Sequence, residues 1–413
     1  MGHAVCNSTT EDQTLTETPL WNGDLTFHDL CLIISGVFAI IASIVSIVPI
    51  MGHALHYTKP IEQRQVIRIL GMVPVYSLVS WLSIYYYKES VYFEIIATSY
   101  EAVAICAFFT LLCHYIAPDL HSQKAYFRNI TPKQWIWPLP WLQRCCGGEQ
   151  GFWRTPRSGL TWFNAVWVDI FQYCLLRVLL SILSIITEYF HIYCEETLSP
   201  AFAYVWILAL DCTAVGIAMF CLVQFYLQIK EVIDQHSPFL KLLCIKLVIF
   251  LSFWQSSLVS LLSSSGVIQA SPKVQSPDIT VGLPNLLISI EMALFAVLHM
   301  FAYPWEPYLP SNIGEVTDLY GNGSAVVQGG RWGLAALLDA WNPRDLLNAV
   351  ARSLRWITVG RKARWQDPSY DHRPILTEAG DGARGLTIAL DEVTGVAERK
   401  LSSTPPTSVQ EVI

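Results

Sequence analysis

Seven long apolar runs alternate with polar segments along the chain. Each run holds about 20 mostly apolar residues, which is the length a helix needs to cross the hydrocarbon core of a bilayer. The pattern therefore predicts an all-α polytopic membrane protein, with a seven-transmembrane-helix bundle over residues 30–304. The expected spans are residues 30–52, 66–87, 91–116, 166–187, 201–226, 243–264 and 283–303.

The composition supports a membrane protein. Hydrophobic residues make up 53% of the chain and charged residues 14%, whereas charged residues reach about 25% in soluble domains. Residues 1–29 contain neither Lys or Arg nor an apolar run before the first span, so we expect an extracytosolic arm and not a cleavable signal peptide. Most cysteines lie in apolar runs, where a thiol behaves as a small hydrophobe; Cys6 and Cys194 are the two that could pair in an oxidising compartment.

Lys and Arg are distributed unevenly between the loops. The first loop is basic, with Lys59 and Arg64, as are the third and fifth loops, whereas the fourth loop carries Glu195 and Glu196 and no basic residue. Basic loops stay in the cytosol, so we expect the N-terminus outside the cytosol and, after seven spans, the C-terminus inside. Among three glycosylation sequons, only that of Asn7 then faces the compartment where N-glycans are added.

The region after the last span divides into two parts. Residues 305–365 form a predicted cytosolic segment with an amphipathic basic helix, in which Asn342 can cap the helix and Pro343 suits its first position. Its apolar stripe either lies on the anionic cytosolic leaflet or packs on the cytosolic ends of the bundle. Residues 366–413 have the composition of a disordered tail.

The third loop indicates membrane contact. Tryptophans and prolines alternate in it, as is typical of an interfacial anchor, and Trp137 and Trp141 are among them. Cys145 and Cys146 follow beside Arg144, so they are candidate palmitoylation sites, with a pair of unmodified thiols as the alternative. Two cysteines are too few for a zinc site.

Ionisable residues lie at the middle of four spans. A charge at this depth costs on the order of 3 kcal/mol and usually faces the bundle interior, so we expect a polar midplane. One possibility is that Arg177 pairs with carboxylates and fixes helix register. One arginine cannot neutralise three carboxylates, however, so at least one must be protonated or must meet water, a cation or a solute. The candidate solute-binding residues are Glu101, Tyr100, Arg177, Asp211, Gln255 and Glu291.

Other functional classes lack their residues. The chain has no GxxxxGK[ST], HExxH, CxxC or GxSxG pattern, so we expect no enzyme and no cofactor. The net charge of −7 gives no reason to expect nucleic acid as a partner. The last span has no lysine for a retinal Schiff base, and it lacks the NPxxY pattern of G-protein-coupled receptors.

Several separated stretches resemble the organic solute transporter subunit alpha and transmembrane protein 184 family, in a fungal-type member. They are VIRILGMVPVYSLVSWLSI, SYEAVAICAFFTLL, FYLQIKEVIDQHSPFLKLLCIKLVIFLSFWQ, IEMALFAVLHMFAYPW and NPRDLL. The resemblance implies ATP-independent passage of amphipathic organic solutes, either steroid-like or anionic, and a vacuolar or other endomembrane location. By position it singles out Tyr100, Glu101, Pro238, Lys246 and the triplet that ends at Gln255.

These observations lead to one main hypothesis and two alternatives. We expect a facilitative carrier whose partners are the lipid membrane, a small organic solute and a single-span beta-type subunit or a second copy of the chain. The first alternative is a vacuolar membrane scaffold that recruits a cytosolic protein through its tail. The second is a seven-span receptor, for which the sequence offers no dedicated motif.

Overall fold

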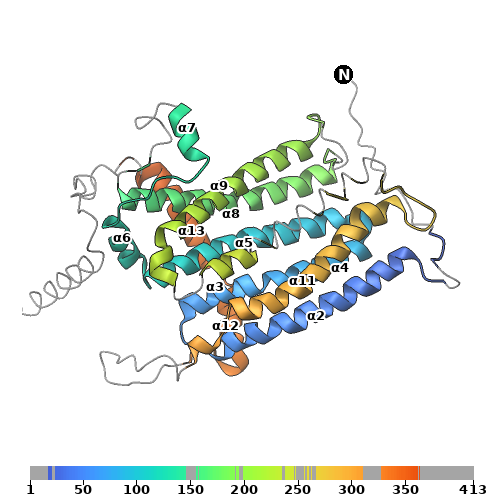
Figure 1. Ribbon diagram of the computed structural model, residues 1–413, viewed down its shortest axis with the longest axis horizontal. Coiled ribbons are helices and arrows are strands. Elements are labelled where there is room, and N and C mark those ends of the chain that lie inside the picture. Colours follow the sequence, from blue (N-terminus) through green and yellow to red (C-terminus); the bar gives the residue numbers. More distant parts are fainter. Residues whose placement is uncertain are drawn as a thin grey trace, which may run out of the picture. The chain divides into compact units, whose positions relative to one another are not determined.

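The computed structural model describes residues 17–20, 24–145, 155–156, 158–190, 192–194, 199–234, 238–245, 247, 255, 258–259, 262, 267–309, 327–360 and 362. Within this part, six helical stretches are long and apolar enough to cross a membrane, and they run side by side (Figure 1). The predicted span at residues 243–264 lies mostly outside it, so the number seven stays a prediction. Asn7, Cys146, most of the N-terminal arm and the tail from residue 366 also lie outside it.

The six stretches follow the order of the predicted spans. They are α2 (Phe27–Leu55), α3 (Pro60–Leu70) continued by α4 (Met72–Tyr85), α5 (Ser90–Ile116), α8 (Gly159–Tyr189), α9 (Ala203–Ile233) and α11 (Leu283–Ala302). Two short helices, α6 (Leu120–Arg128) and α7 (Leu139–Cys145), lie between α5 and α8. After the last span come α12 (Leu334–Trp341) and α13 (Arg344–Arg355).

Helix ends are fixed by capping residues outside the apolar runs. At α2, the Thr26 side chain accepts a hydrogen bond from the backbone N–H of Asp29, and the Asp29 carboxylate accepts one from the backbone N–H of Thr26. Ser158 caps α8 in a similar way through the N–H of Thr161. Such caps satisfy donors that the first helical turn leaves open, so both helices begin before the predicted spans do.

Helix α5 lies between two apolar cores. On one side, Phe109 of α5 packs with Phe163 and Trp167 of α8 and Phe225 of α9. On the other side, Ala104 of α5 belongs to a core formed with α2, α4 and α11. The helices therefore form two groups that share α5, which is the central helix in Figure 1.

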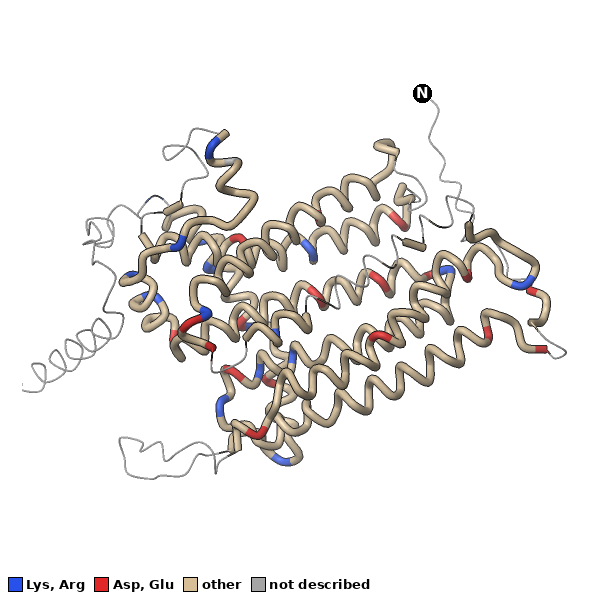
Figure 2. The backbone as a smooth tube through the Cα atoms, in the orientation of Figure 1, with Lys and Arg blue, Asp and Glu red and all other residues tan. Residues whose placement is uncertain are grey.

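The outward faces of the long helices are apolar. Ile40 on α2, Leu179 on α8 and Leu210 on α9 are each more than half exposed, as a surface surrounded by lipid requires. Charged residues lie mainly near helix ends, and Figure 2 shows most Lys and Arg gathered toward one end of the bundle. This distribution fits the bias between loops on which the predicted orientation depends.

The predicted basic helix corresponds in part to α13, with a different start. Asn342 does not take the cap position: α13 begins at Arg344 with Pro343 as its N-cap, and the Asn342 side chain accepts a hydrogen bond from the N–H of Arg344 at 3.1 Å. Leu346 and Val350 pack toward the main core, whereas Leu347 is exposed. One side of α13 thus packs on the bundle, and its contact with a leaflet stays a prediction.

Candidate functional site

Glu101 lies in the interior of the bundle, near the middle of α5. Its side chain is buried, and its Oε2 accepts a hydrogen bond from the hydroxyl of Tyr76 on α4 at 2.9 Å. A hydroxyl donor of this kind compensates part of the cost of burying a carboxylate. The carboxylate therefore links α5 to α4 at mid-span depth.

Arg177 and Asp211 form an ion pair between α8 and α9. Arg177 NH1 lies 2.7 Å from Asp211 Oδ2, and both side chains are less than one-fifth exposed. Arg177 Nε and Asp211 Oδ1 are buried and have no hydrogen-bond partner within the described chain. The pair thus retains one donor and one acceptor that no described residue uses.

These two sites lie close enough to interact electrostatically. The Arg177 guanidinium interacts with Glu101 as well as with Asp211, and Tyr173, one helical turn before Arg177, interacts with all three charged groups. Charges interact over longer distances in a low-dielectric interior than in water. The structure therefore brings three predicted residues, Glu101, Arg177 and Asp211, into one cluster, which we call the midplane cluster.

Two tyrosines, Tyr76 and Tyr173, also belong to this cluster, and neither of them was predicted from the sequence. Tyr76 sits in an apolar span, and its proximity to Glu101 depends on how α4 packs against α5. The place of Tyr173 could have been predicted, because it precedes Arg177 by four residues and residues at this spacing lie on the same face of a helix.

Tyr100 lies elsewhere. Its hydroxyl donates to the backbone carbonyl of Arg68 on α3 at 2.8 Å, and it occupies the space that a side chain on Gly71 would need. Consecutive residues on an α-helix point about 100° apart, so Tyr100 and Glu101 face different neighbours. The contacts of Tyr100 are those of a residue that positions α3 against α5.

Glu291 and Gln255 are not connected to the midplane cluster by any contact in the described chain. Glu291 lies on α11, which packs against α2 and α4, and its Oε2 is buried without a hydrogen-bond partner there. Gln255 is an isolated described residue within the predicted span at 243–264, and its Nε2 also lacks a partner. Both keep unused polar atoms, and their part in a common cavity stays a prediction.

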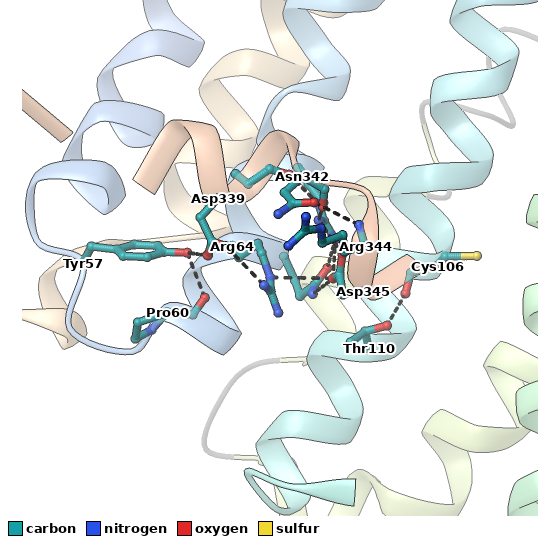
Figure 3. A network of polar contacts seen from close by, with 12 residues as sticks. Tyr57, Pro60, Arg64, Cys106, Thr110, Asp339, Asn342, Arg344 and Asp345 are labelled. Carbon is teal, nitrogen blue, oxygen red and sulfur yellow. Dashed lines mark hydrogen bonds and ion pairs between the residues drawn. The ribbon is translucent and has the colours of Figure 1, made fainter. Parts of the chain in front are cut away.

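A second polar network joins the C-terminal segment to the bundle (Figure 3). Arg68 of α3 donates to both oxygens of Asp345 on α13, at 2.7 and 2.8 Å. The same guanidinium donates to the carbonyl of Ala340 at 2.6 Å and to that of Asn342 at 2.7 Å. We call these contacts the Arg68 clamp. A guanidinium with its planar fork of donors suits such a site, where a lysine could not make all four bonds.

The neighbours of the Arg68 clamp keep Asp345 ionised. Burial by itself would raise the pKa of the Asp345 carboxyl, but hydrogen bonds from Arg68 and Gln65 and the charges of Arg68 and Arg64 outweigh it and lower the pKa to about 2. Beside it, Asp339 accepts a hydrogen bond from the hydroxyl of Tyr57 at 2.7 Å. In the sequence, Arg64 indicates only a basic loop on the cytosolic side, and no pattern predicts the clamp.

A third contact holds the far part of α13. The Arg352 guanidinium carbon lies 3.9 Å from the centroid of the Trp167 ring on α8, and the Trp167 Nε1–H donates to the carbonyl of Ala349 at 3.2 Å. Burial lowers the pKa of Arg352 to about 10. A cation over a tryptophan face is a favourable pair, and more so when it is desolvated.

The chemistry available at the midplane cluster is recognition of charge. Within the described residues, no group of His, Cys, Asp and Glu is arranged to hold a metal ion. The cluster instead offers a guanidinium, two carboxylates and two phenols between helices, with a donor on Arg177 and an acceptor on Asp211 unused. Such groups can exchange one partner for another as helices move.

Comparison with known proteins identifies the family of the chain. No solved structure matches the chain. A transmembrane protein 184 homologue of Dictyostelium discoideum is 27% identical over 301 residues, which cover 72% of this chain and 56% of that protein. The chain thus spans little more than half the length of this relative. The organic solute transporter Ostalpha family matches residues 31–308, a region that includes the midplane cluster and Arg68. Because this match covers more than half of the chain, the chain belongs to the organic solute transporter Ostalpha family, a family of membrane transporters.

Proposed function

We propose that the chain carries amphipathic organic solutes, steroid-like or anionic, across its membrane without ATP. The observation that carries this proposal is the ion pair of Arg177 and Asp211 beside Glu101, inside the bundle and at mid-span depth. Ionisable groups at such a depth are costly and commonly mark a solute or ion path. Membership of a transporter family supports the same function.

Arg177 is the candidate recognition residue for an anionic solute. Its Nε has no hydrogen-bond partner among the residues that the structure describes, so an anionic group on a solute can be bound while the pair with Asp211 loosens. Glu101 then lies within electrostatic reach of the same guanidinium and takes over part of the charge balance. Apolar helix faces around the cluster accommodate the rest of an amphipathic molecule. Binding and release of this kind shift the pairing between α8 and α9 without covalent chemistry.

The proposal is tested by flux measurements on the purified chain. Uptake of labelled steroid conjugates and organic anions into proteoliposomes is compared between wild type, Glu101→Gln and Glu231→Gln. Glu231 is a matched control, because it is an exposed carboxylate, with 76% of its side chain accessible, paired to Lys133 at 3.2 Å. We expect reduced flux for Glu101→Gln alone, at equal protein content. Normal flux in Glu101→Gln would reject Glu101 as a site residue.

A second arm of this experiment tests for a partner subunit. If the well-folded chain alone shows no flux, the same measurement is repeated after co-reconstitution with a single-span beta-type subunit. Flux that appears only then assigns transport to the complex. Absence of flux in both preparations would favour a scaffold over a carrier.

Location and modification are part of the proposal. Cys194 is disulfide-bonded, with its partner outside the described residues, and disulfides persist in oxidising compartments. This supports an extracytosolic loop between α8 and α9, and hence the predicted N-terminus outside the cytosol and C-terminus inside. The proposed vacuolar or other endomembrane location rests on the family resemblance. Cys145 is exposed at the end of α7 near Trp141, which is also exposed, as palmitoylation requires; Asn7 is the proposed glycan site.

A further inference from the structure

Helix α12 has two different faces. Its small residues Ala336 and Ala340 are buried, and the helix packs against α2 and α3. On the opposite side, Leu334, Leu338 and Trp341 are 59%, 74% and 68% exposed. Their spacing of four and three residues places them on one side of the helix, and we call them the outer face of α12. The outer face of α12 is therefore apolar at all three positions.

The depth of α12 follows from its partners. Close to its start, Gly333 lies so near Ala54, the penultimate residue of α2, that a side chain at Gly333 would contact it at 2.9 Å. At the other end, the carbonyls of Ala340 and Asn342 are bound by Arg68. Arg68 is eight residues beyond Pro60, or about 12 Å along the span at a rise of 1.5 Å per residue.

The end of α12 therefore lies within the bilayer zone. Arg68 is the third residue of the predicted apolar span 66–87, so it lies about 3 Å inside the edge of the hydrocarbon core at a rise of 1.5 Å per residue. Trp341 also lies 6.3 Å from Tyr100, measured between ring centroids, and Tyr100 is well inside α5. Helix α12 thus runs from the end of α2 inward along α3.

The break between α12 and α13 is compatible with this depth. Non-helical backbone at membrane depth is tolerated only where its polar groups find partners inside the protein. The chain turns at Asn342 and Pro343, and the Arg68 guanidinium binds two of the carbonyls that the end of α12 leaves open. The Arg68 clamp supplies the donors that such a turn needs.

We infer that α12 is a re-entrant anchor whose outer face contacts lipid acyl chains. Lipid is the favoured occupant because α12 packs directly against α2, a span whose own apolar residues Val48 and Leu55 are 53% and 45% exposed. At the start of α12, Trp332 is exposed beside Arg331, a pairing suited to the head-group region. Eight residues are too few to cross the bilayer, so α12 enters and leaves on one side.

The test is photocrosslinking in the full chain. A benzophenone amino acid is placed at Leu338, and in a separate variant at Glu231, and each protein is reconstituted in phosphatidylcholine vesicles, irradiated and examined by mass spectrometry. Leu338 is exposed, so the larger side chain does not disturb the core; monodisperse protein in both variants confirms this. We expect lipid adducts at position 338 several-fold above those at position 231.

Two outcomes would overturn the inference. Equal, low lipid labelling at both positions would show that the outer face meets water. Crosslinking of position 338 mainly to a second copy of the chain would show a protein interface in its place. Both outcomes leave the transport proposal untouched, because neither depends on the midplane cluster.

Discussion

Replacing Asp345 by Asn tests whether the Arg68 clamp holds the C-terminal segment on the bundle. The substitution keeps the shape of the side chain and removes the charge that Arg68 contacts at 2.7 and 2.8 Å. The pKa of Asp345 is lowered from 3.8 to about 2, and each unit corresponds to about 1.4 kcal/mol, so the interaction contributes about 2 kcal/mol. Breaking a fully buried pair costs about 3–5 kcal/mol; Asp345 is 24% exposed, so we adopt the smaller value.

The assay compares unfolding temperatures of wild type, Asp345→Asn and Asp339→Asn in the same nanodiscs. Asp339 is the control, because its side chain is 35% exposed and its ion pair with Arg64 is longer, at 3.3 Å; pairs of this kind contribute less than about 1 kcal/mol. The amide oxygen of Asn can still accept the hydrogen bond that the Tyr57 hydroxyl donates to Asp339. We expect a clear fall for Asp345→Asn and faster proteolytic release of the segment after residue 327. The same unfolding temperature in all three proteins would show that the contact between Arg68 and Asp345 does not stabilise the fold.

The pH dependence of the same interaction has a defined sign. The folded-state pKa of Asp345, about 2, lies below its ordinary value of 3.8. The stabilisation is therefore complete above about pH 4 and is lost as pH falls from about 4 to 2. Between pH 5 and 8, the difference between wild type and Asp345→Asn should stay constant. A difference that changed across this range would show that another titrating group controls the contact.

Two further predictions concern packing and burial. Gly71→Ala places a carbon 2.4 Å from the Tyr100 hydroxyl oxygen, so we expect the free energy of unfolding to fall by about 1–3 kcal/mol. Tyr100→Phe in the same chain should restore most of this loss, as measured by the unfolding temperature, and equal stability of the single and double variants would contradict this. Burial lowers the pKa of Lys241 from 10.5 to about 8. Because the charged form is disfavoured in the folded state, stability should rise as pH increases from about 8 to 10.5, and Lys241→Met should abolish that rise.

The sequence predicts the spans well because bilayer thickness dictates a long apolar run. It predicts their ends less well, since hydropathy marks the hydrocarbon core and not the helix. Helix α8 begins at Gly159 and not near residue 166, because Ser158 caps it and Trp162 and Phe163 pack against Phe127. Aromatic residues that meet from two segments far apart in the sequence leave no periodic pattern in either segment.

The midplane cluster was only partly predictable from the sequence. Arg177 and Asp211 stand out because ionisable residues in spans are rare, and the pairing of Arg177 with a carboxylate was one of the expected alternatives. Tyr100 shows that neighbours in the sequence need not share a site, since it precedes Glu101 in the sequence but contacts α3 in the structure. Helix α12 was missed because an apolar run of eight residues cannot be separated from a loop by hydropathy.

The Arg68 clamp also has a consequence for how the chain is made. Arg68 enters the membrane with the second span, and Asp345 is synthesised 277 residues later. Until then, the guanidinium lacks this counter-charge and the two backbone carbonyls, however well the spans have inserted. A nascent chain that stops short of residue 345 would thus leave Arg68 at the membrane without these partners. The second span therefore reaches its final set of contacts only after the C-terminal segment has docked.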